Sequence, residues 1–351
     1  MQTSDNNAKT VGAGGPPPAV TLMQMFLAPL LQRSICVVAR LKIADLLASG
    51  SKPVSALAKQ TQTNEDALYR VLRLLATAGI FVEKENHEFS LTPLASLLRS
   101  DVPDSLYHYA IMMGEDWLWE DWGQLMYCVK TGSTAQEKVH GMDSFQFFAK
   151  NKEAGIVFNN AMTNLSQSDV PSIVASYDFS AFHKLVDIAG GHGLALAKVL
   201  KANPKLHAVL YELPYVIEGA KEFLKKEGLI NQVELVSGDF FESVPSGADA
   251  YMMKHIIHDW NDERCIQLLR NIGSAMDKKG KVLIIEMVVP GINIPGPAKM
   301  LDLQMLVMEG GKERTKEEFE TLLNSAGFNL NRIIPTGSPF SIIEGQLISA
   351  K

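Results

Sequence analysis

Apolar and polar side chains alternate at helical spacing through the N-terminal part of the chain. Apolar positions after residue 40 recur every three or four residues until Gly50 ends the pattern. The stretch NEDALYRVLRLLATAGI has the same spacing and predicts an amphipathic helix capped by Asn64. FVEKENHEFSLT instead alternates every second residue around a turn at Glu85-Asn86, which predicts a hairpin. Helices followed by a hairpin predict a winged-helix-like domain over residues 21–105.

The segment 106–180 predicts further helices and is rich in aromatic residues. Burial in an ordinary core is the more common role of any one aromatic side chain. Some of them, Phe158 included, could instead form the wall of a pocket for a flat substrate. We therefore interpret this segment as a helical linker that contributes to a substrate pocket.

Short aliphatic runs alternate with helical segments from residue 181 to the C-terminus. The runs are KLVDIAG, LHAVLYEL, VELVSGD, ADAYMMKHI and KVLIIEMVV. This alternation predicts a Rossmann-like, doubly wound α/β domain over residues 181–351, with a parallel sheet covered by helices on both faces. The last runs, NLNRIIPTG and FSIIEGQLI, could close the sheet as a hairpin.

Residues 1–20 are polar and then rich in glycine and proline, so we interpret them as a flexible tail. They lack the apolar stretch that a signal peptide needs. The apolar stretch from Met23 to Leu47 is interrupted by charged and amide side chains, whereas a membrane span needs about 20 mostly apolar residues. We predict that this stretch forms a homodimer contact and does not span a membrane.

The net charge of −6 argues against a nucleic-acid partner, because such proteins usually carry a basic face. Cys36, Cys128 and Cys265 are scattered, which favours a reducing compartment over a disulfide framework or a zinc site. No group of acidic and histidine residues has the spacing of metal ligands, so we predict no metal. These features predict a cytoplasmic protein.

A glycine-rich turn, DIAGGHG from Asp187 to Gly193, follows the first aliphatic run and precedes a helix. Such turns bring the backbone close to a ligand, so Asp187, Gly190 and Gly191 are candidate cofactor contacts. A dinucleotide fingerprint starting at Gly191 would need glycine or alanine where the chain has Leu196. An NAD(P)-dependent oxidoreductase is therefore the weaker alternative. The methyltransferase spacing, acid-x-G-x-G-x-G, fits except that alanine replaces the first glycine.

Acidic residues also follow the next two predicted strands. Glu212 ends the second strand, where an acid commonly accepts hydrogen bonds from both hydroxyls of an adenosine ribose. Asp239 follows the third strand and is placed to accept from an adenine amino group, while Phe240 packs on the ring. Singly, each acid is more often a loop cap or a solvated charge. Acids at successive strand ends beside a glycine turn favour a nucleoside pocket.

Three blocks of sequence carry a family resemblance: KHIIHDW from Lys254, Ile285-Glu286, and GGKERT from Gly310. They resemble the small-molecule O-methyltransferases typified by the caffeic acid, acetylserotonin, polyketide and phenazine enzymes. The resemblance runs from about residue 20 to the C-terminus. It implies a helical N-terminal dimerisation domain, a Rossmann-like catalytic domain and S-adenosylmethionine as the cofactor.

By position, the resemblance implies that His258 is the general base and that Glu286 and Glu313 flank and orient it. It further implies that Lys254 contacts the cofactor and that Met162 lines the substrate pocket. We add Asp259, the neighbour of the base, as a candidate substrate contact. The chain departs from plant relatives at Ala189 and His192 of the glycine turn, and its Glu212 is longer than the usual aspartate. These changes could tilt the cofactor without removing its acceptors.

The chemistry of methyl transfer agrees with a histidine base. A phenol with a pKa of about 10 is mostly protonated at neutral pH, whereas histidine, with a pKa of about 6.5, is mostly neutral. A neutral imidazole in contact with the hydroxyl can take its proton as the methyl group arrives. Nearby carboxylates would stabilise the imidazolium that forms. We therefore predict O-methylation of a small aromatic molecule, with N-methylation of a heteroaromatic ring as the alternative.

Two other histidines compete with His258 for the role of base. His255 is predicted to lie inside the fourth strand, and His192 beside the cofactor. A non-enzymatic winged-helix regulator that senses a small ligand is a further alternative. The acidic net charge and the complete set of His258 and its two acids argue against it.

Overall fold

The structure is a computed structural model that describes residues 16–348. Most of the predicted tail lies outside the described residues, and its last part, from Pro18, already belongs to a helix. The chain divides into two compact units, one that ends at Arg99 and one that begins at Ser100. The sequence placed this boundary slightly later, at residue 105.

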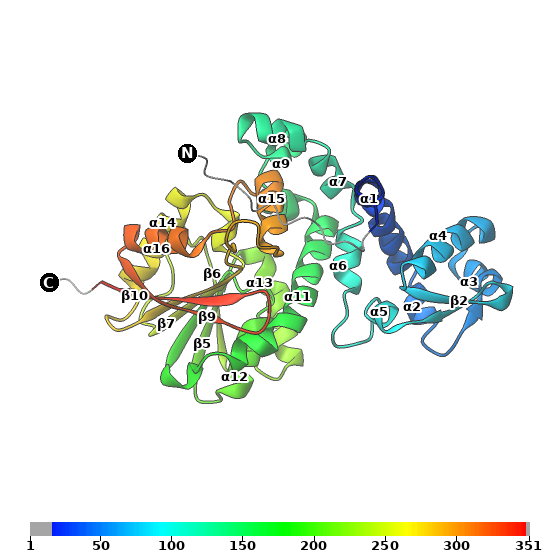
Figure 1. Ribbon diagram of the computed structural model, residues 1–351. Helices are drawn as coiled ribbons and strands as arrows, with labels where there is room; N and C mark the ends of the chain where they lie inside the picture. Colours follow the sequence, from blue (N-terminus) through cyan, green and yellow to red (C-terminus); the bar gives the residue numbers. More distant parts are fainter. Residues whose placement is uncertain (1–15, 349–351) are drawn as a thin grey trace, which may run out of the picture. The chain divides into compact units, whose positions relative to one another are not determined.

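The first unit combines helices with a small antiparallel sheet (Figure 1). Asn64 caps its fourth helix by accepting a hydrogen bond from the backbone N–H of Ala67, and the predicted hairpin turns at Glu85-Asn86. Its strands have the order β1-β3-β2. The elements are α1 (Pro18–Arg40), α2 (Ile43–Leu46), β1 (Lys52–Pro53), α3 (Val54–Thr61), α4 (Glu65–Thr77), β2 (Phe81–Lys84), β3 (Glu88–Leu91) and α5 (Pro93–Ser96).

Helix α1 exposes a row of large apolar side chains. These are Val20, Leu22, Met23, Met25, Phe26, Leu27 and Leu30. By length and composition alone, α1 is long and apolar enough to cross a membrane, so its polar residues are by themselves an insufficient argument against a span. Contiguous apolar surface of this kind marks a contact with a partner or a membrane.

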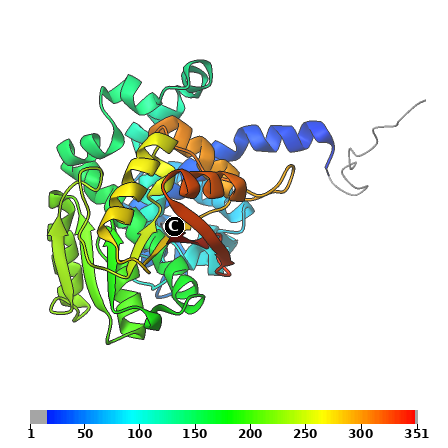
Figure 2. The same ribbon diagram turned by 90° about the vertical axis from the view of Figure 1, so that its left-hand side faces the viewer.

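The second unit is built on a seven-stranded sheet with the order β6-β5-β4-β7-β8-β10-β9. The first five of these strands are parallel, and β10 runs antiparallel to both β8 and β9, so the predicted C-terminal hairpin is confirmed (Figure 2). Chain order reverses between β4 and β7, the position where open α/β sheets bind ligands. The strands are β4 (Lys184–Ile188), β5 (His207–Glu212), β6 (Val233–Ser237), β7 (Ala250–Lys254), β8 (Lys281–Glu286), β9 (Phe328–Pro335) and β10 (Ser341–Leu347).

Alternate side chains of the buried strands point to opposite faces of this sheet. Val186 and Tyr251 pack against α14 (Asp262–Ala275) and α16 (Lys316–Ser325). The neighbouring positions face α12 (Leu194–Ala202) and α13 (Pro214–Lys226). Helices therefore cover both faces, as the doubly wound prediction requires (Figure 1).

A layer of helices from the middle of the chain, which includes the predicted segment 106–180, belongs to this same unit. Trp117, Phe148 and Ala161 form its apolar core together with Val307 and Met308, which come from a later helix. The layer comprises α6 (Tyr107–Met112), α7 (Asp116–Trp122), α8 (Leu125–Thr131), α9 (Ala135–His140), α10 (Ser144–Lys150), α11 (Lys152–Ala175) and α15 (Ala298–Met308).

Candidate active site

The glycine turn after β4 has a backbone that admits a close ligand. Gly191 and Gly193 have φ angles of 58° and 83°, and Ala189 adopts the left-handed region at 52° although it carries a side chain. A Cβ at Gly190 would overlap the Asp187 carboxylate. The turn therefore requires glycine at this position, and it leads directly into the N-terminus of α12.

Asp187, Glu212 and Lys254 lie close enough to influence one another's charge. Asp187 is buried and its Oδ2 has no hydrogen-bond partner in the described chain, while Lys254 Nζ donates to Ser166 Oγ at 3.1 Å. Burial raises the pKa of Asp187 to about 7 and that of Glu212 to about 8, and it lowers the pKa of Lys254 to about 8. Buried charges with unused bonding capacity are typical of a polar ligand site.

Asp239 and Phe240 follow β6, as predicted. Asp239 is exposed, and its Oδ1 accepts a hydrogen bond from the backbone N–H of Phe241 at 2.8 Å, so it also caps its own loop. The ring of Phe240 packs edge-on against Trp260, which stacks on Phe145. These rings form an apolar wall, and the contact of Phe240 with adenine remains a prediction.

His258 lies in a short 3-10 turn directly after β7. It is 4% exposed, and its Nδ1 is 2.6 Å from Glu313 Oε1. Its Nε2 is 3.3 Å from an oxygen of Asp259. A carboxylate at Nδ1 holds the ring proton on that nitrogen, so that Nε2 carries the free lone pair. Nε2 is therefore the atom that can accept a proton.

Glu286, at the end of β8, acts on the backbone of the turn more than on the imidazole. Its Oε1 accepts hydrogen bonds from the N–H groups of Ile256 at 3.0 Å and His258 at 3.2 Å. Its Oε2 is 4.0 Å from His258 Nδ1. The two acids thus have different tasks, because Glu313 holds the ring and Glu286 holds the turn that carries it.

Arg314 is a positioning residue that the sequence reasoning missed, although it lies inside the GGKERT block. Its guanidinium is buried and donates to the carbonyl oxygens of Ile257 and Trp260, at 2.9 Å each. It also pairs with Asp262 at 2.7 Å. These bonds connect both sides of the turn to the strand-like segment that carries Glu313.

Two further residues complete this support. Asp302 of α15 accepts a hydrogen bond from the backbone N–H of Glu313 at 2.9 Å. A Cβ at Gly311 would overlap the backbone of His258 and Asp259, so only glycine allows the two segments to approach. No sequence pattern pointed to Asp302, whereas Gly311 was visible within the GGKERT block.

The competing histidines have other surroundings. His255 lies just beyond β7 and not inside it, with a φ of 58°, and its ring contacts those of His258 and Phe340. Burial and the neighbouring charge of Lys254 keep its pKa well below the usual value. His192 Nδ1 is 3.2 Å from Thr163 Oγ1, and a Cβ at Gly219 would meet its ring. His192 therefore packs between two helices.

The protonation states of His258 and Glu313 depend on their surroundings. Burial lowers the pKa of His258, the charge of Glu286 opposes this shift, and the charges of Lys254 and Arg314 add to it, so the net shift favours the neutral imidazole. Burial raises the pKa of Glu313 to about 8, which by itself favours the acid. The 2.6 Å contact with Nδ1 opposes that effect, because an Nδ1–H donates most strongly to an ionised oxygen.

The predicted substrate contacts are only partly brought together. Phe158 stacks on Phe148 with ring centroids 4.4 Å apart, and Met162 packs on the same apolar cluster of the helical layer. Asp259 lies instead beside the base, where burial and the charge of Glu309 raise its pKa well above the usual value. Contact of these residues with a substrate stays a prediction.

His258, Glu286 and Glu313 each offer a ligand atom, and these atoms lie within 4.8 Å of one another. The sequence spacing missed this group because its members come from separate segments. Two ligands of a tetrahedral zinc ion would be about 3.3 Å apart, given bonds of about 2 Å. The 2.6 Å contact is instead a hydrogen-bond distance, which favours a base and its orienting acid. That no metal is required stays a prediction.

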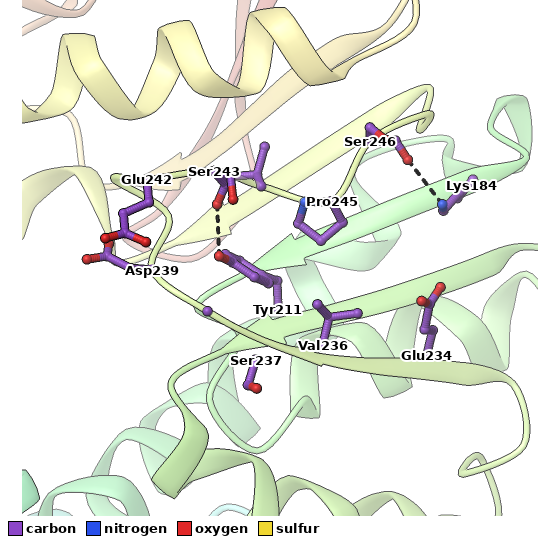
Figure 3. Close-up of a pocket in the computed structure, with 12 residues that line it drawn as sticks. Lys184, Tyr211, Glu234, Val236, Ser237, Asp239, Glu242, Ser243, Pro245 and Ser246 are labelled. Carbon is purple, nitrogen blue, oxygen red and sulfur yellow. Dashed lines mark hydrogen bonds between the residues drawn. The ribbon is translucent and has the colours of Figure 1, made fainter.

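A cavity of about 500 Å³ lies along β5 and β6 (Figure 3). In it, the Tyr211 hydroxyl donates to the Ser243 carbonyl and Lys184 Nζ donates to the Ser246 carbonyl. Of the predicted site residues it includes Asp239 alone. The predicted catalytic residues His258, Glu286 and Glu313 do not line this cavity.

The chain matches the O-methyltransferase domain over residues 122–329 and the O-methyltransferase dimerisation domain over residues 22–101. It is similar to the phenazine O-methyltransferase PhzM of Lysobacter antibioticus, with 41% identity over 96% of this chain and 98% of that protein. Fold and site together therefore define a methyl-transferring enzyme with an N-terminal dimerisation domain. The chain belongs to the O-methyltransferase family. This membership replaces the oxidoreductase and regulator alternatives.

Two other proteins are informative. The chain is 35% identical to the 8-amino-8-demethylriboflavin N,N-dimethyltransferase of Streptomyces davaonensis, over 88% of this chain and 89% of that protein. It also resembles the crystal structure of NcsB1, an O-methyltransferase from neocarzinostatin biosynthesis, in complex with S-adenosylmethionine and 2-hydroxy-5-methyl naphthoic acid. That match has a TM-score of 0.78 and 28% identity, and it covers 90% of this chain and 96% of the other.

The different tasks of Glu313 and Glu286 predict unequal losses of activity. Glu313→Gln should lower kcat by roughly 10²–10⁴, because the ring loses its ionised partner and the proton on Nδ1 loses its preferred place. Glu286→Gln should cost about tenfold or less, since the amide oxygen can still accept both backbone N–H groups. Steady-state kinetics of the two variants measure this difference. Equal losses, or a larger loss for Glu286→Gln, would contradict the assignment.

Proposed function

We propose that this enzyme transfers the methyl group of S-adenosylmethionine to a hydroxyl of a small aromatic molecule, with His258 as the general base. The observation that carries this proposal is that His258 is buried and that Glu313 contacts its Nδ1, which leaves Nε2, beside Asp259, as the ring nitrogen that would meet the acceptor. Family membership supports the reaction class. The aromatic ligands in the names of the relatives support the acceptor class.

The residues around the glycine turn fit S-adenosylmethionine. Glu212 uses Oε2 to accept from the backbone N–H of Leu213, so Oε1 is available to the ribose hydroxyls. The unpartnered Oδ2 of Asp187 and the ammonium of Lys254 offer opposite charges to the methionine end. The required glycine at position 190 keeps the turn free of a side chain.

The chemistry needs alignment and a proton acceptor. When bound, S-adenosylmethionine supplies a methyl group on a sulfonium, which is already a good leaving system. Nε2 of His258 takes the proton of the acceptor hydroxyl as the new bond to oxygen forms. Glu313 stabilises the resulting imidazolium through Nδ1, and Asp259, beside Nε2, contacts the acceptor.

Methylation of a nitrogen acceptor is the second candidate, favoured by the similarity to the N,N-dimethyltransferase. The two candidates differ in their need for His258. An aromatic amine or ring nitrogen has a lone pair without losing a proton first, whereas a phenol at neutral pH does not.

Replacement of the base tests the proposal directly. His258→Ala should lower kcat with a phenolic acceptor by roughly 10²–10⁴ and leave the affinity for S-adenosylmethionine nearly unchanged. Raising the pH should partly restore the rate, because an ionised phenolate needs no base. Radiolabelled methyl transfer between pH 7 and 10 and calorimetry of cofactor binding measure these effects. His255→Ala and His192→Ala serve as matched controls.

Near wild-type turnover of His258→Ala at pH 7, with chemistry rate-limiting, would refute the base assignment. A larger loss in either control variant, with cofactor binding preserved, would also refute it. A residual rate that does not respond to pH would favour the nitrogen acceptor.

The raised pKa of Glu212 predicts that cofactor binding releases a proton. In the free enzyme Glu212 has a pKa of about 8 and is mostly protonated at pH 7. Two ribose hydroxyls donate best to the ionised carboxylate, so binding lowers this pKa. The association constant should therefore rise by at most about tenfold per pH unit up to pH 8 and then level off. Calorimetry in buffers of different ionisation enthalpy counts the released proton.

Two variants control this measurement. Glu212→Gln should weaken the pH dependence, leaving only the part due to Asp187 and Lys254. It should also lower the affinity, because each hydrogen bond to the charged acceptor contributes about 1.5–3 kcal/mol. Asp239→Asn alters an exposed acid that is also predicted to contact the cofactor, and it should keep the pH dependence. An affinity of the wild-type enzyme that is constant between pH 6 and 8 would place the ribose elsewhere.

We further propose that the enzyme is a cytoplasmic homodimer. The match to the dimerisation domain includes most of α1, whose apolar row is exposed in one copy of the chain. A second copy of this unit is therefore the partner we expect for α1, in preference to a membrane. The three cysteines are free and buried, which agrees with a reducing compartment.

Light scattering should give the mass of a dimer at micromolar concentration. Phe26→Asp, which places a charge on α1 where the phenyl ring is 68% exposed, should shift the mass toward the monomer. Met126→Asp places a charge at a similarly exposed apolar position on α8 and is the control, with no change expected. A monomeric wild-type protein, or one that needs detergent to stay in solution, would contradict the proposal.

A further inference from the structure

Four polar side chains are buried between α7 and α9 without a hydrogen-bond partner in the described chain. They are Trp117 and Asp121 of α7 and Gln136 and His140 of α9, which we call the α7–α9 polar cluster. Both carboxylate oxygens of Asp121 and both amide atoms of Gln136 lack partners, as do Trp117 Nε1 and His140 Nε2. Asp121 and Gln136 are each 0% exposed.

The helix geometry explains why these groups meet. Trp117 and Asp121 are one helical turn apart, as are Gln136 and His140, so each pair lies on one face of its helix. His140 Nε2 is 3.4 Å from Asp121 Oδ1, which brings the two faces together. Burial raises the pKa of Asp121 to about 7, and the charge of Glu120 adds to the effect.

An arrangement of this kind indicates an external partner. Buried polar groups in folded proteins are almost always paired, and an unpaired buried carboxylate is especially costly. Asp121 and Gln136 have complementary groups, since an amide N–H can donate to a carboxylate, yet they do not pair with each other. Apart from the 3.4 Å approach of His140 Nε2 to Asp121 Oδ1, the described chain offers these donors and acceptors no partner.

Aromatic rings connect the cluster to the predicted acceptor contacts. Phe147 packs against His140, with ring centroids 4.6 Å apart, and against Trp117 at 6.1 Å. Phe148 contacts Trp117 at 5.4 Å and stacks on Phe158 at 4.4 Å. The polar cluster thus borders the same apolar wall as Phe158.

Charged groups connect the cluster to the base from the other side. Burial raises the pKa of Glu309, directly after α15, to about 7, and the charge of Asp121 contributes. Glu309 in turn raises the pKa of Asp259, whose oxygen is 3.3 Å from His258 Nε2. Asp121 therefore interacts electrostatically with Glu309, as Asp143 does, and Glu309 interacts with Asp259 beside the base.

We propose that the α7–α9 polar cluster binds the end of the acceptor that is remote from the methylated hydroxyl and selects a planar group with adjacent N–H and C=O, such as a carboxamide or lactam. Asp121 accepts from the N–H, and Trp117 Nε1 donates to the carbonyl oxygen. Gln136 can do both. The aromatic walls hold the flat ring system between the two polar ends. This inference rests on the proposed function.

A pair of matched acceptors tests the inference. A hydroxyphenazine carboxamide offers N–H and C=O, whereas its methyl ester keeps the carbonyl and lacks the N–H. Dissociation constants are measured by calorimetry with S-adenosylhomocysteine present, and kcat and KM by methyl transfer. Asp121→Leu, which has a similar volume and no acceptor oxygen, should weaken binding of the amide about tenfold or more, because a site built for an N–H loses its acceptor, and should change that of the ester less than twofold.

Two further variants separate recognition from a structural role. Gln136→Leu should also weaken amide binding, yet it should raise the melting temperature, because it removes unpaired buried groups. Glu120→Gln removes a charge from the exposed neighbour of Asp121 and should change neither affinity nor selectivity.

An unchanged ratio of amide to ester affinity in Asp121→Leu would overturn the inference. A lower melting temperature of Gln136→Leu, together with an equal loss of affinity for the amide and the ester, would also overturn it. That result would indicate that the cluster binds a buried water. A wild-type enzyme that binds both acceptors but methylates neither would refute the proposed function, while the ratio of affinities would still decide the inference. Failure to bind either acceptor would refute this choice of ligand chemistry.

Discussion

The buried guanidinium of Arg314 supports the geometry of the active site. It donates to carbonyl oxygens on both sides of the turn that carries His258, and it pairs with Asp262 at the start of α14. An arginine suits this task because its rigid fork of N–H groups stays charged when buried. The guanidinium also offsets the negative charge of the neighbouring acids. The contact between Glu313 and Nδ1 of His258 depends on this arrangement, since Arg314 follows Glu313 directly in the chain.

The site contains several buried or partly buried acidic side chains, Asp187, Glu212 and Glu313 among them. Burial raises the pKa of Asp187 to about 7, and it raises those of Glu212 and Glu313 to about 8. Isolated buried charges destabilise a protein, and their enrichment in one place is characteristic of functional sites. In this enzyme the acids serve separate partners. In the proposed mechanism, Asp187 and Glu212 contact the cofactor, whereas Glu313 stabilises the imidazolium that forms when His258 takes a proton.

Local sequence patterns predicted most of the fold. The change from helical to alternating periodicity located the sheet, and turn and capping residues such as Asn64 located element ends. The family resemblance of the KHIIHDW, Ile285-Glu286 and GGKERT blocks assigned His258, Glu286 and Glu313 to one site. It did not reveal that Glu286 binds the backbone, because that choice depends on the path of the turn after β7. The α7–α9 polar cluster was also invisible, since Asp121 and Gln136 look like ordinary polar positions of surface helices.

By itself, the sequence determined which residue types follow each strand, and its family resemblance gave the class of enzyme and the candidate base, His258. Short-range physics is sufficient to locate the strands and the glycine turn, because strand periodicity and glycine turns are properties of neighbouring residues. Tertiary structure decided which charges are buried and which of them are paired. Desolvation and hydrogen bonding depend on segments far apart in the chain, as when Glu313 meets the ring of His258 or Asp121 approaches His140. Protonation states and unpaired groups follow from that burial, and so they could be assigned only once the segments were packed together.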